Sequence, residues 1–192
     1  MGISESKPKD SIRIPAVQIH NVAQQRPMTH EIGGLMFFDA NGKYESTKLV
    51  GGGTCRGKDG SHIVQCSVQI PEGRVHWHTH PKGNRPSSTD LRNALIFDAH
   101  NGGLRKTNLL FSPRGVWVFR PTAKLIQDFR DIPPAQRLRR VKVWKFLGHY
   151  FQNDLQQDRV QEFQQRLREH GFDNSFYPYS YFSNNVDLVI EF

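Results

Sequence analysis

The chain has 192 residues, enough for one domain with a hydrophobic core, and its 36% hydrophobic and 23% charged residues are typical of a folded protein. No apolar run approaches the roughly 18 residues that span a bilayer, so we expect no membrane contact and a cytoplasmic location. The formal net charge of +8 favours acidic partners or nucleic acid.

The first half of the chain predicts mainly strands. Residues 12–30 carry apolar positions at mixed spacing that fit either a strand or a short helix. Glu31–Asp39 is typical of a strand ended by a turn at Asn41-Gly42. Three further strands are predicted near Lys48–Val50, at His62–Ile70 and at Arg74–His80.

The second half predicts both helices and strands. A helix begins near Ser88-Thr89-Asp90 and continues through Leu91–Ala99. Four segments follow it: strands at Thr107–Ser112 and Gly115–Arg120, a helical pattern over Ala135–His170 that is broken near Gln152–Asp158, and a terminal strand over Val186–Phe192. This order indicates a mixed α/β fold with a helical C-terminal extension.

Two cysteines, Cys55 and Cys66, lie in strand-like surroundings. Two thiols cannot form a disulfide framework, so we expect them to be reduced in an intracellular compartment. A second feature of composition is a basic run that holds Arg137, Arg139, Arg140 and Lys142. On a helix this run forms either a solvated face or a surface for an acidic partner or nucleic acid.

The most informative segment is His78-Thr79-His80-Pro81, followed by Ser87-Ser88-Thr89-Asp90. In an extended segment, His78 and His80 lie on one face because side chains alternate. Asp90 can fold back as a third ligand. Three nitrogen and oxygen ligands with one open position are typical of a catalytic zinc, whereas structural zinc sites have four ligands, usually including cysteine.

A hydrolytic zinc site also needs a carboxylate to move protons and a donor for the developing oxyanion. Glu31 fits the role of general base, because it stands at the head of an apolar strand where packing gives no reason for a charge. Ser87, three residues before Asp90, offers a hydroxyl beside the metal.

Taken together, Glu31 with Gly34-Leu35, His78-Thr79-His80-Pro81 and Ser87-x-x-Asp90 resemble the signature of the JAMM (MPN+) zinc metallopeptidases. The match covers about residues 15–122. Trp77, directly before His78, resembles the compact prokaryotic and viral-type members of that family.

The resemblance implies a cytidine-deaminase-like fold, with a mixed sheet flanked by helices. It assigns His78, His80 and Asp90 to Zn²⁺, Glu31 to the base that activates the metal-bound water, and Ser87 to the oxyanion. It implies cleavage of isopeptide or peptide bonds at the C-terminus of ubiquitin or a ubiquitin-like protein. The expected organisation is a flexible segment 1–11, a catalytic core 12–125, and a helical extension 126–192 that ends in a strand.

The sequence departs from the family pattern in two places. Six residues separate His80 from Ser87, where the family has about seven, and Ser88 would restore that gap but break the Ser-x-x-Asp spacing. His76 shares a face with His78 and His80, so it is either a competing ligand or substrate contact, or a histidine outside the ligand set.

Two alternatives of other classes stay open. One is a catalytically inactive MPN-type scaffold, although such scaffolds usually lack a ligand or the base and this chain has both. The other is binding of nucleic acid or an acidic partner through the basic run. A TIM-barrel amidohydrolase is excluded by length, since such barrels typically need about 250 residues.

Overall fold

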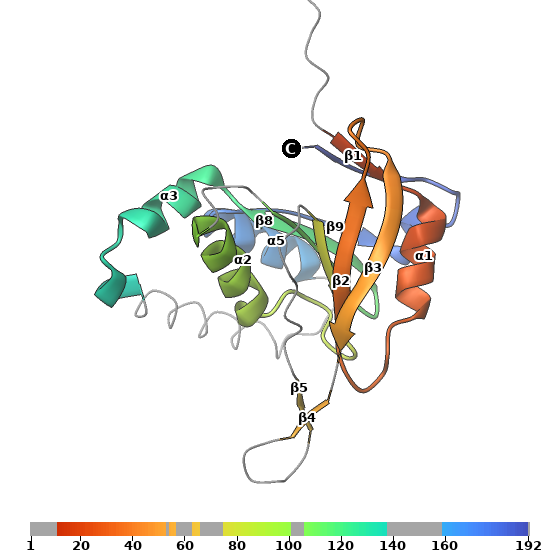
Figure 1. The fold of residues 1–192 in the computed structure, drawn as a ribbon, viewed down its shortest axis with the longest axis horizontal. Coiled ribbons are helices and arrows are strands. Elements are labelled where there is room, and N and C mark those ends of the chain that lie inside the picture. The colour runs from red at the N-terminus through yellow and green to blue at the C-terminus, as the bar shows by residue number, and fades with distance from the viewer. Residues whose placement is uncertain are drawn as a thin grey trace, which may run out of the picture.

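The computed structural model describes residues 11–52, 54–56, 63–65, 75–100, 106–137 and 159–191. They form a mixed α/β architecture in which helices flank a mixed sheet, which confirms the predicted class at this coarse level (Figure 1). The sheet has six strands in the order β3-β2-β6-β7-β8-β9. In chain order these strands are β2 Ile32–Phe38, β3 Tyr44–Gly52, β6 Val75–Thr79, β7 Thr107–Phe111, β8 Gly115–Pro121 and β9 Phe172–Pro178.

One parallel pair in this sheet determines where the polar motif lies. Strands β6 and β7 run parallel, whereas the other neighbours in the sheet are antiparallel. A parallel pair needs a crossover, and here helix α2 (Ser88–His100) provides it. The carboxyl end of β6 therefore lies beside the start of β2 and is followed by the start of α2. Ligand sites in α/β folds commonly form beyond the carboxyl ends of strands.

The two faces of the sheet pack against different elements because strand side chains alternate. On one face, Trp77, Leu109 and Phe111 pack against helix α1 (Ala16–Gln24). On the other face, Leu110, Trp117 and Phe119 pack against α2 and against helix α5 (Val160–Glu169). The buried strands β7 and β8 are thus apolar on both faces.

The N-terminal and C-terminal segments close the first face together. Strand β1 (Ser11–Ile14) pairs antiparallel with β10 (Leu188–Glu191), and the short helix η2 (Tyr179–Phe182) contacts α1. Residues 12–30 therefore contain both a strand and a helix.

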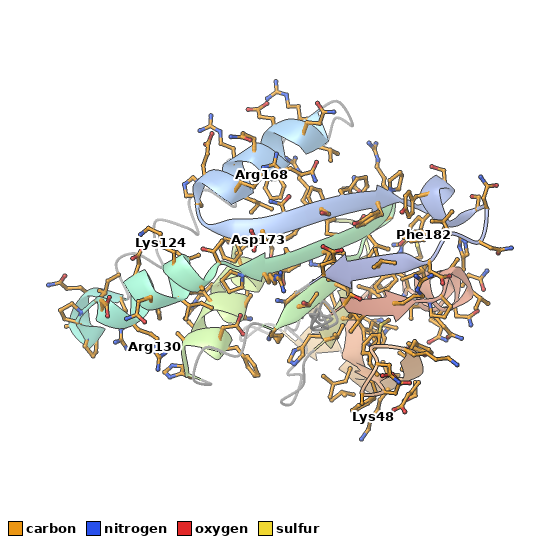
Figure 2. The ribbon with its side chains drawn as sticks, turned by 90° about the horizontal axis from the view of Figure 1, so that it is seen from above. Lys48, Lys124, Arg130, Arg168, Asp173 and Phe182 are labelled. Carbon is orange, nitrogen blue, oxygen red and sulfur yellow. The ribbon has the colours of Figure 1, made fainter. Side chains whose placement is uncertain are left out.

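In the view from above, Lys124 and Phe182 lie toward opposite ends of the molecule (Figure 2).

Most of the strands and helices predicted from the sequence occur in the structure. The predicted strands at 31–39, 48–50, 74–80, 107–112 and 115–120, the helix at 88–99 and the terminal strand all occur, with boundaries shifted by a few residues. Of the predicted strand at 62–70, the structure describes β5 (Ile63–Gln65), which pairs with β4 (Thr54–Arg56). In the predicted helical region, residues 134–137 and α5 are helical, and residues 138–158 lie outside the described residues.

Helix α3 (Ala123–Asp131) and strand β9 were not predicted, and neither were the short strand β4 and the helix η2. Strand β9 pairs along the whole of β8, so residues beyond 125 complete the sheet of the predicted core. Among the described residues, no helix is long and apolar enough to cross a membrane.

A buried lysine lies next to α2. Lys106 is 7% exposed, and its Nζ lies 3.9 Å from the ring centroid of Phe97. Its backbone N–H donates to the buried carboxylate of Asp98. Burial lowers the pKa of Lys106 to about 8, and the negative charge of Asp98 opposes the shift without cancelling it.

We expect the buried ammonium of Lys106 to make stability depend on pH in the alkaline range. Its folded-state pKa of about 8 lies below the ordinary value of 10.5, so between these values the unfolded chain binds more protons. The free energy of unfolding of the wild type should therefore rise with pH over this window, by at most about 3 kcal/mol relative to Lys106→Met. Urea unfolding of both proteins at a series of pH values measures this difference, and parallel pH curves would contradict it.

Candidate metal centre

The predicted ligand residues converge in the structure. The ligand atoms of His78, His80 and Asp90 all lie within 4.8 Å of one another, and these residues form the one such group among the described His, Cys, Asp and Glu side chains. Asp90 Oδ1 lies 3.2 Å from His78 Nε2, and Asp90 Oδ2 lies 3.3 Å from His80 Nε2. The two imidazoles thus direct the same ring nitrogen toward one carboxylate.

Strand geometry places the two histidines. His78 lies opposite Gly33 in the β6–β2 pair, and His80 follows the last residue of β6. The backbone N–H of His80 donates to the carbonyl of Phe111 at 3.0 Å, so the chain stays beside β7 after the strand ends. His76 is buried on the same face against Phe97 and does not belong to the ligand group.

Glu31 lies beside the ligand group and comes from a different segment of the chain. Its Oε1 lies 3.5 Å from His80 Nε2, and its side chain is 12% exposed. The next residue, Ile32, donates its backbone N–H to Thr79 Oγ1 at 3.1 Å, which ties the start of β2 to the end of β6. The register of β2 therefore places Glu31 beside the histidines.

Ser87 and Asp90 form a reciprocal capping arrangement at the start of α2. The Ser87 backbone N–H and hydroxyl each donate to Asp90 Oδ2 at 2.7 Å, and the Asp90 backbone N–H donates to Ser87 Oγ at 3.2 Å. This is a capping box with Asp in place of the usual Glu. It is Ser87, and not Ser88, that contacts Asp90. The same four residues therefore begin the helix and orient the third ligand.

The loop 81–86 spans the gap although it is one residue shorter than the family pattern. Its Asn84 carbonyl accepts a 2.7 Å hydrogen bond from Trp117 Nε1, and its Pro81 carbonyl accepts a 2.8 Å bond from Arg26. Gly83 packs against the His80 ring so closely that a Cβ there would lie 3.1 Å from Nδ1. The short loop is held at three points.

These contacts also fix the orientation of the His80 ring. The ring hydrogen-bonds the backbone of Arg85, and Nδ1 is the nitrogen that faces this loop. With Nδ1 engaged by the loop, Nε2 is the nitrogen directed at Glu31 and Asp90. A second hydrogen bond of this kind is what sets the tautomer of a metal-binding histidine.

The electrostatics of the group keep Asp90 ionised. Burial raises the pKa of Asp90, but the facing imidazoles of His78 and His80 outweigh it and hold that pKa well below its usual range. Burial also lowers the pKa of His80, yet the hydrogen bond and charge of Asp90 and the charge of Glu31 raise it overall. Asp90 is therefore an anion that is ready to bind a cation.

Glu31 behaves differently from Asp90. Burial raises the pKa of the Glu31 carboxyl, and the nearby histidines only partly oppose this. Two carboxylates in one site thus have pKa values that are shifted in opposite directions. Such a division is typical of sites where one acid binds and the other exchanges protons.

The side chains of the group themselves indicate a metal site, without reference to any protein family. The Nε2 atom of His78 is buried and makes no hydrogen bond of acceptable geometry, although Asp90 Oδ1 lies 3.2 Å away. Buried polar atoms without a hydrogen bond are rare and call for an explanation. Two imidazoles and a carboxylate, with no thiolate, suit a divalent transition metal.

The sequence did not reveal the residues that hold the loop. Trp117 and Arg26 act through bonds to backbone carbonyls of residues far away in the chain, and such bonds leave no pattern in a sequence.

Among the residues of the basic run, Arg137 donates to the carbonyls of Ile132 and Arg130 and lies over the Phe129 ring. Arg139, Arg140 and Lys142 lie outside the described residues.

Comparisons with models of protein families, with curated proteins and with solved structures found no match.

We expect Asp90→Asn to remove metal binding without removing the helix. Asparagine keeps an oxygen that accepts the Ser87 bonds but lacks the charge, so zinc affinity should fall by more than about a hundredfold. The metal-free protein should stay folded but lose some stability, because the ionised Asp90 is paired with His78 and His80 and the neutral amide is not. Zinc content after gel filtration and competition with a chromophoric chelator measure the effect, with Asp128→Asn as a control on the exposed face of α3.

We expect Ser87→Ala to lower the stability of the protein while the metal ligands remain. It removes the hydroxyl that caps α2, which costs about 0.5–2 kcal/mol of stability, but it leaves all three ligands in place. Thermal unfolding of the metal-free protein would detect the loss. If Ser87→Ala were as stable as the wild type, the capping arrangement would not hold the helix as described.

Gly83→Ala tests the contact between the short loop and His80. The added methyl group must move either the ring or the loop by a few tenths of an ångström, so we expect zinc affinity to fall about tenfold or more. Zinc competition measures this, and Ser46→Ala, at an exposed position of β3, serves as a control. Unchanged affinity would mean that the loop is free to yield.

Proposed function

We propose that this chain is a zinc-dependent hydrolase of the JAMM type, with a cytidine-deaminase-like fold. Its proposed substrate is an isopeptide or peptide bond at the C-terminus of ubiquitin or a ubiquitin-like protein. One observation carries the proposal: His78, His80 and Asp90 converge within 4.8 Å, and Glu31 lies 3.5 Å from His80. These residues come from separate parts of the chain, and the fold brings them together.

His78, His80 and Asp90 are the residues that would hold the metal. Zinc is proposed because two imidazole nitrogens and one carboxylate oxygen match the ligand sets of zinc hydrolases, which leave a position open. When bound, such an ion acts as a Lewis acid that polarises a carbonyl and makes water acidic enough to attack near neutral pH. The low pKa of Asp90 means that no proton has to be removed from this ligand first.

Glu31 is proposed as the general acid–base. In hydrolysis of an amide bond, a proton must leave the attacking water and another must reach the departing nitrogen. Burial raises the Glu31 pKa above its ordinary value, which makes this carboxylate a better proton acceptor than an exposed one. Its 3.5 Å distance from His80 places it beside the ligand group without making it part of that group.

Ser87 is proposed as the donor to the developing oxyanion. For this the hydroxyl has to turn from Asp90 Oδ2 toward the substrate carbonyl. The Ser87 backbone N–H, also 2.7 Å from that oxygen, keeps Asp90 hydrogen-bonded while the hydroxyl turns. The capping box therefore frees one donor without releasing the ligand.

The proposed substrate class rests on the resemblance of the motif alone. A ubiquitin-like tail is therefore tested as a panel, in which ubiquitin and several prokaryotic ubiquitin-like proteins and sulfur-carrier proteins are each fused through their C-terminal glycine to a reporter. The metal-loaded full chain is incubated with each fusion, and release of the reporter is measured.

We expect Glu31→Gln to abolish cleavage while metal binding remains. Glutamine keeps the shape and a hydrogen-bonding oxygen but cannot carry the proton, so kcat should fall by at least about a hundredfold. Zinc content should stay near one equivalent, because Glu31 is not a ligand. Glu45→Gln, on the exposed side of β3, is the matched control and should retain full activity.

The results separate the hydrolase from the scaffold. Protein that binds zinc, cleaves a fusion and loses cleavage in Glu31→Gln supports the hydrolase. Protein that binds no zinc even when supplied with it supports the inactive MPN-type scaffold. Cleavage that persists in Glu31→Gln and in the presence of a chelator would exclude this site as its source.

A further inference from the structure

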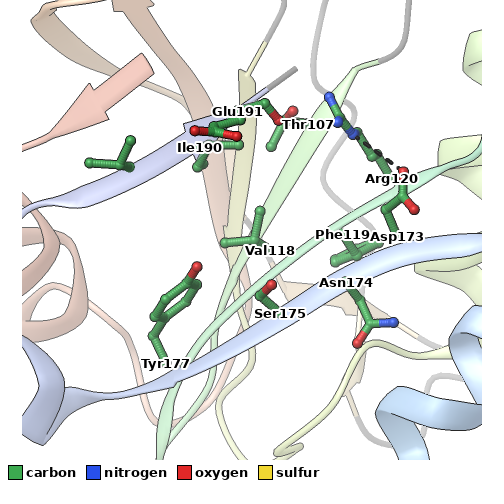
Figure 3. A pocket seen from close by; sticks show the side chains of 11 residues that line it. Thr107, Val118, Phe119, Arg120, Asp173, Asn174, Ser175, Tyr177, Ile190 and Glu191 are labelled. Atoms are coloured by element: carbon green, nitrogen blue, oxygen red, sulfur yellow. Dashed lines mark hydrogen bonds and ion pairs between the residues drawn. The ribbon is translucent and has the colours of Figure 1, made fainter. Parts of the chain in front are cut away.

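A cavity outside the metal-ligand group is lined by residues of β7, β8, β9 and β10 (Figure 3). Val118 belongs to the core on the α1 face, as does Trp77, whereas His78 points to the α2 face by strand alternation. The cavity also lies toward the other end of the strands, because Thr107 pairs with Val75 at the start of β6. We call it the β10 pocket, since β10 forms one of its walls.

The floor of the β10 pocket carries three hydroxyl groups from the sheet. Thr107 is fully buried and its Oγ1 makes no hydrogen bond with any described residue. Ser175 and Tyr177, at alternate positions of β9, also line the pocket, and their hydroxyls have no hydrogen bond to the part of the chain that the structure describes. A buried hydroxyl without a partner is rare in proteins, so Thr107 indicates a bound molecule or water in the pocket. Ser175 and Tyr177 are half-buried and offer two further hydroxyls to the same space.

The charged groups of the pocket lie at its rim and engage one another. Arg120 Nε lies 3.8 Å from Asp173 Oδ2, and the Arg120 guanidinium donates to the Glu191 carbonyl at 3.1 Å. An anion would meet a guanidinium that is already paired and two carboxylates, those of Asp173 and Glu191. A cation would meet the positive charge of Arg120, and the Asp173 side chain is 54% exposed, so its negative charge is screened by water.

Apart from Asn174, whose amide donates to the carbonyls of Gln164 and Phe172, the remaining lining is apolar, and the space is small. Val118 and Ile190 present aliphatic surface, and Tyr177 adds an aromatic ring. The cavity volume is about 140 Å³, below the roughly 300–1,000 Å³ of pockets for drug-sized ligands. Hydroxyls that both donate and accept, next to surface for C–H groups, suit a compact neutral molecule with hydroxyls of its own.

We propose that the β10 pocket binds a small neutral polyhydroxylated molecule of about the size of one sugar ring, through the hydroxyls of Thr107, Ser175 and Tyr177. The site is separate from the metal centre, so this proposal does not depend on the proposed hydrolase activity. It adds a binding function on a face of the sheet where the motif analysis placed none.

The test is a titration of the full chain with D-ribose and with glycerol, followed by amide chemical shifts in two-dimensional NMR. We expect saturable shifts at residues 107, 118, 175, 177 and 190. Thr107→Val and Ser175→Ala each remove one hydroxyl at nearly constant shape, so each should weaken ribose binding about tenfold. Ser180→Ala, an exposed serine in η2, is the matched control and should bind ribose like the wild type.

Val118→Phe provides a test that does not depend on a buried threonine. The larger ring should fill the cavity and abolish the shifts, while zinc content stays unchanged because the metal centre lies on the other face. The proposal would be overturned by the absence of saturable shifts with both polyols, which would mean that water alone fills the pocket. Shifts that survive in Val118→Phe, or that arise with phosphate or methylammonium but not with polyols, would also overturn it.

Discussion

The metal-ligand group depends on one constraint: the charge of Asp90 must stay buried in a fixed orientation. A buried carboxylate is costly unless it is paired and hydrogen-bonded. Here the two imidazoles supply the pairing, and the N-terminus of α2 supplies the bonds, since Ser87 donates both its N–H and its hydroxyl to one oxygen. Negative charge in the first turn of a helix is also stabilised by the helix dipole.

This constraint connects the site to the topology of the sheet. The parallel β6–β7 pair requires a crossover helix, and that helix has to begin just beyond the end of β6, where the histidines lie. The loop 81–86 sets the distance between them, and its bonds with Trp117 and Arg26 come from β8 and from the segment after α1. The sheet, the crossover and the loop thus act together to bring one carboxylate between two imidazoles.

Local patterns were sufficient to predict the elements that hold the site, and insufficient for the elements that close the fold. The His-x-His spacing, the turn at Gly42 with its positive φ, and the Ser-x-x-Asp box are short-range features, so a sequence displays them directly. The β8–β9 and β1–β10 pairings join partners far away in the chain, and the residues of β9 themselves alternate weakly. The same limit applies to Arg26 and Trp117, whose partners are backbone carbonyls that carry no residue identity.

The Ser87-x-x-Asp90 box serves two purposes, and this affects how the motif is interpreted. A capping box stabilises α2 whether or not a metal binds, so its presence alone does not distinguish an enzyme from a scaffold. Glu31 differs, because among the described residues its side chain pairs only with His80, and burial works against its charge. A residue that costs stability and contributes little to packing is characteristic of a functional site. Glu31 is therefore the residue on which the hydrolase proposal most depends, although the histidine pair is the more conspicuous feature of the sequence.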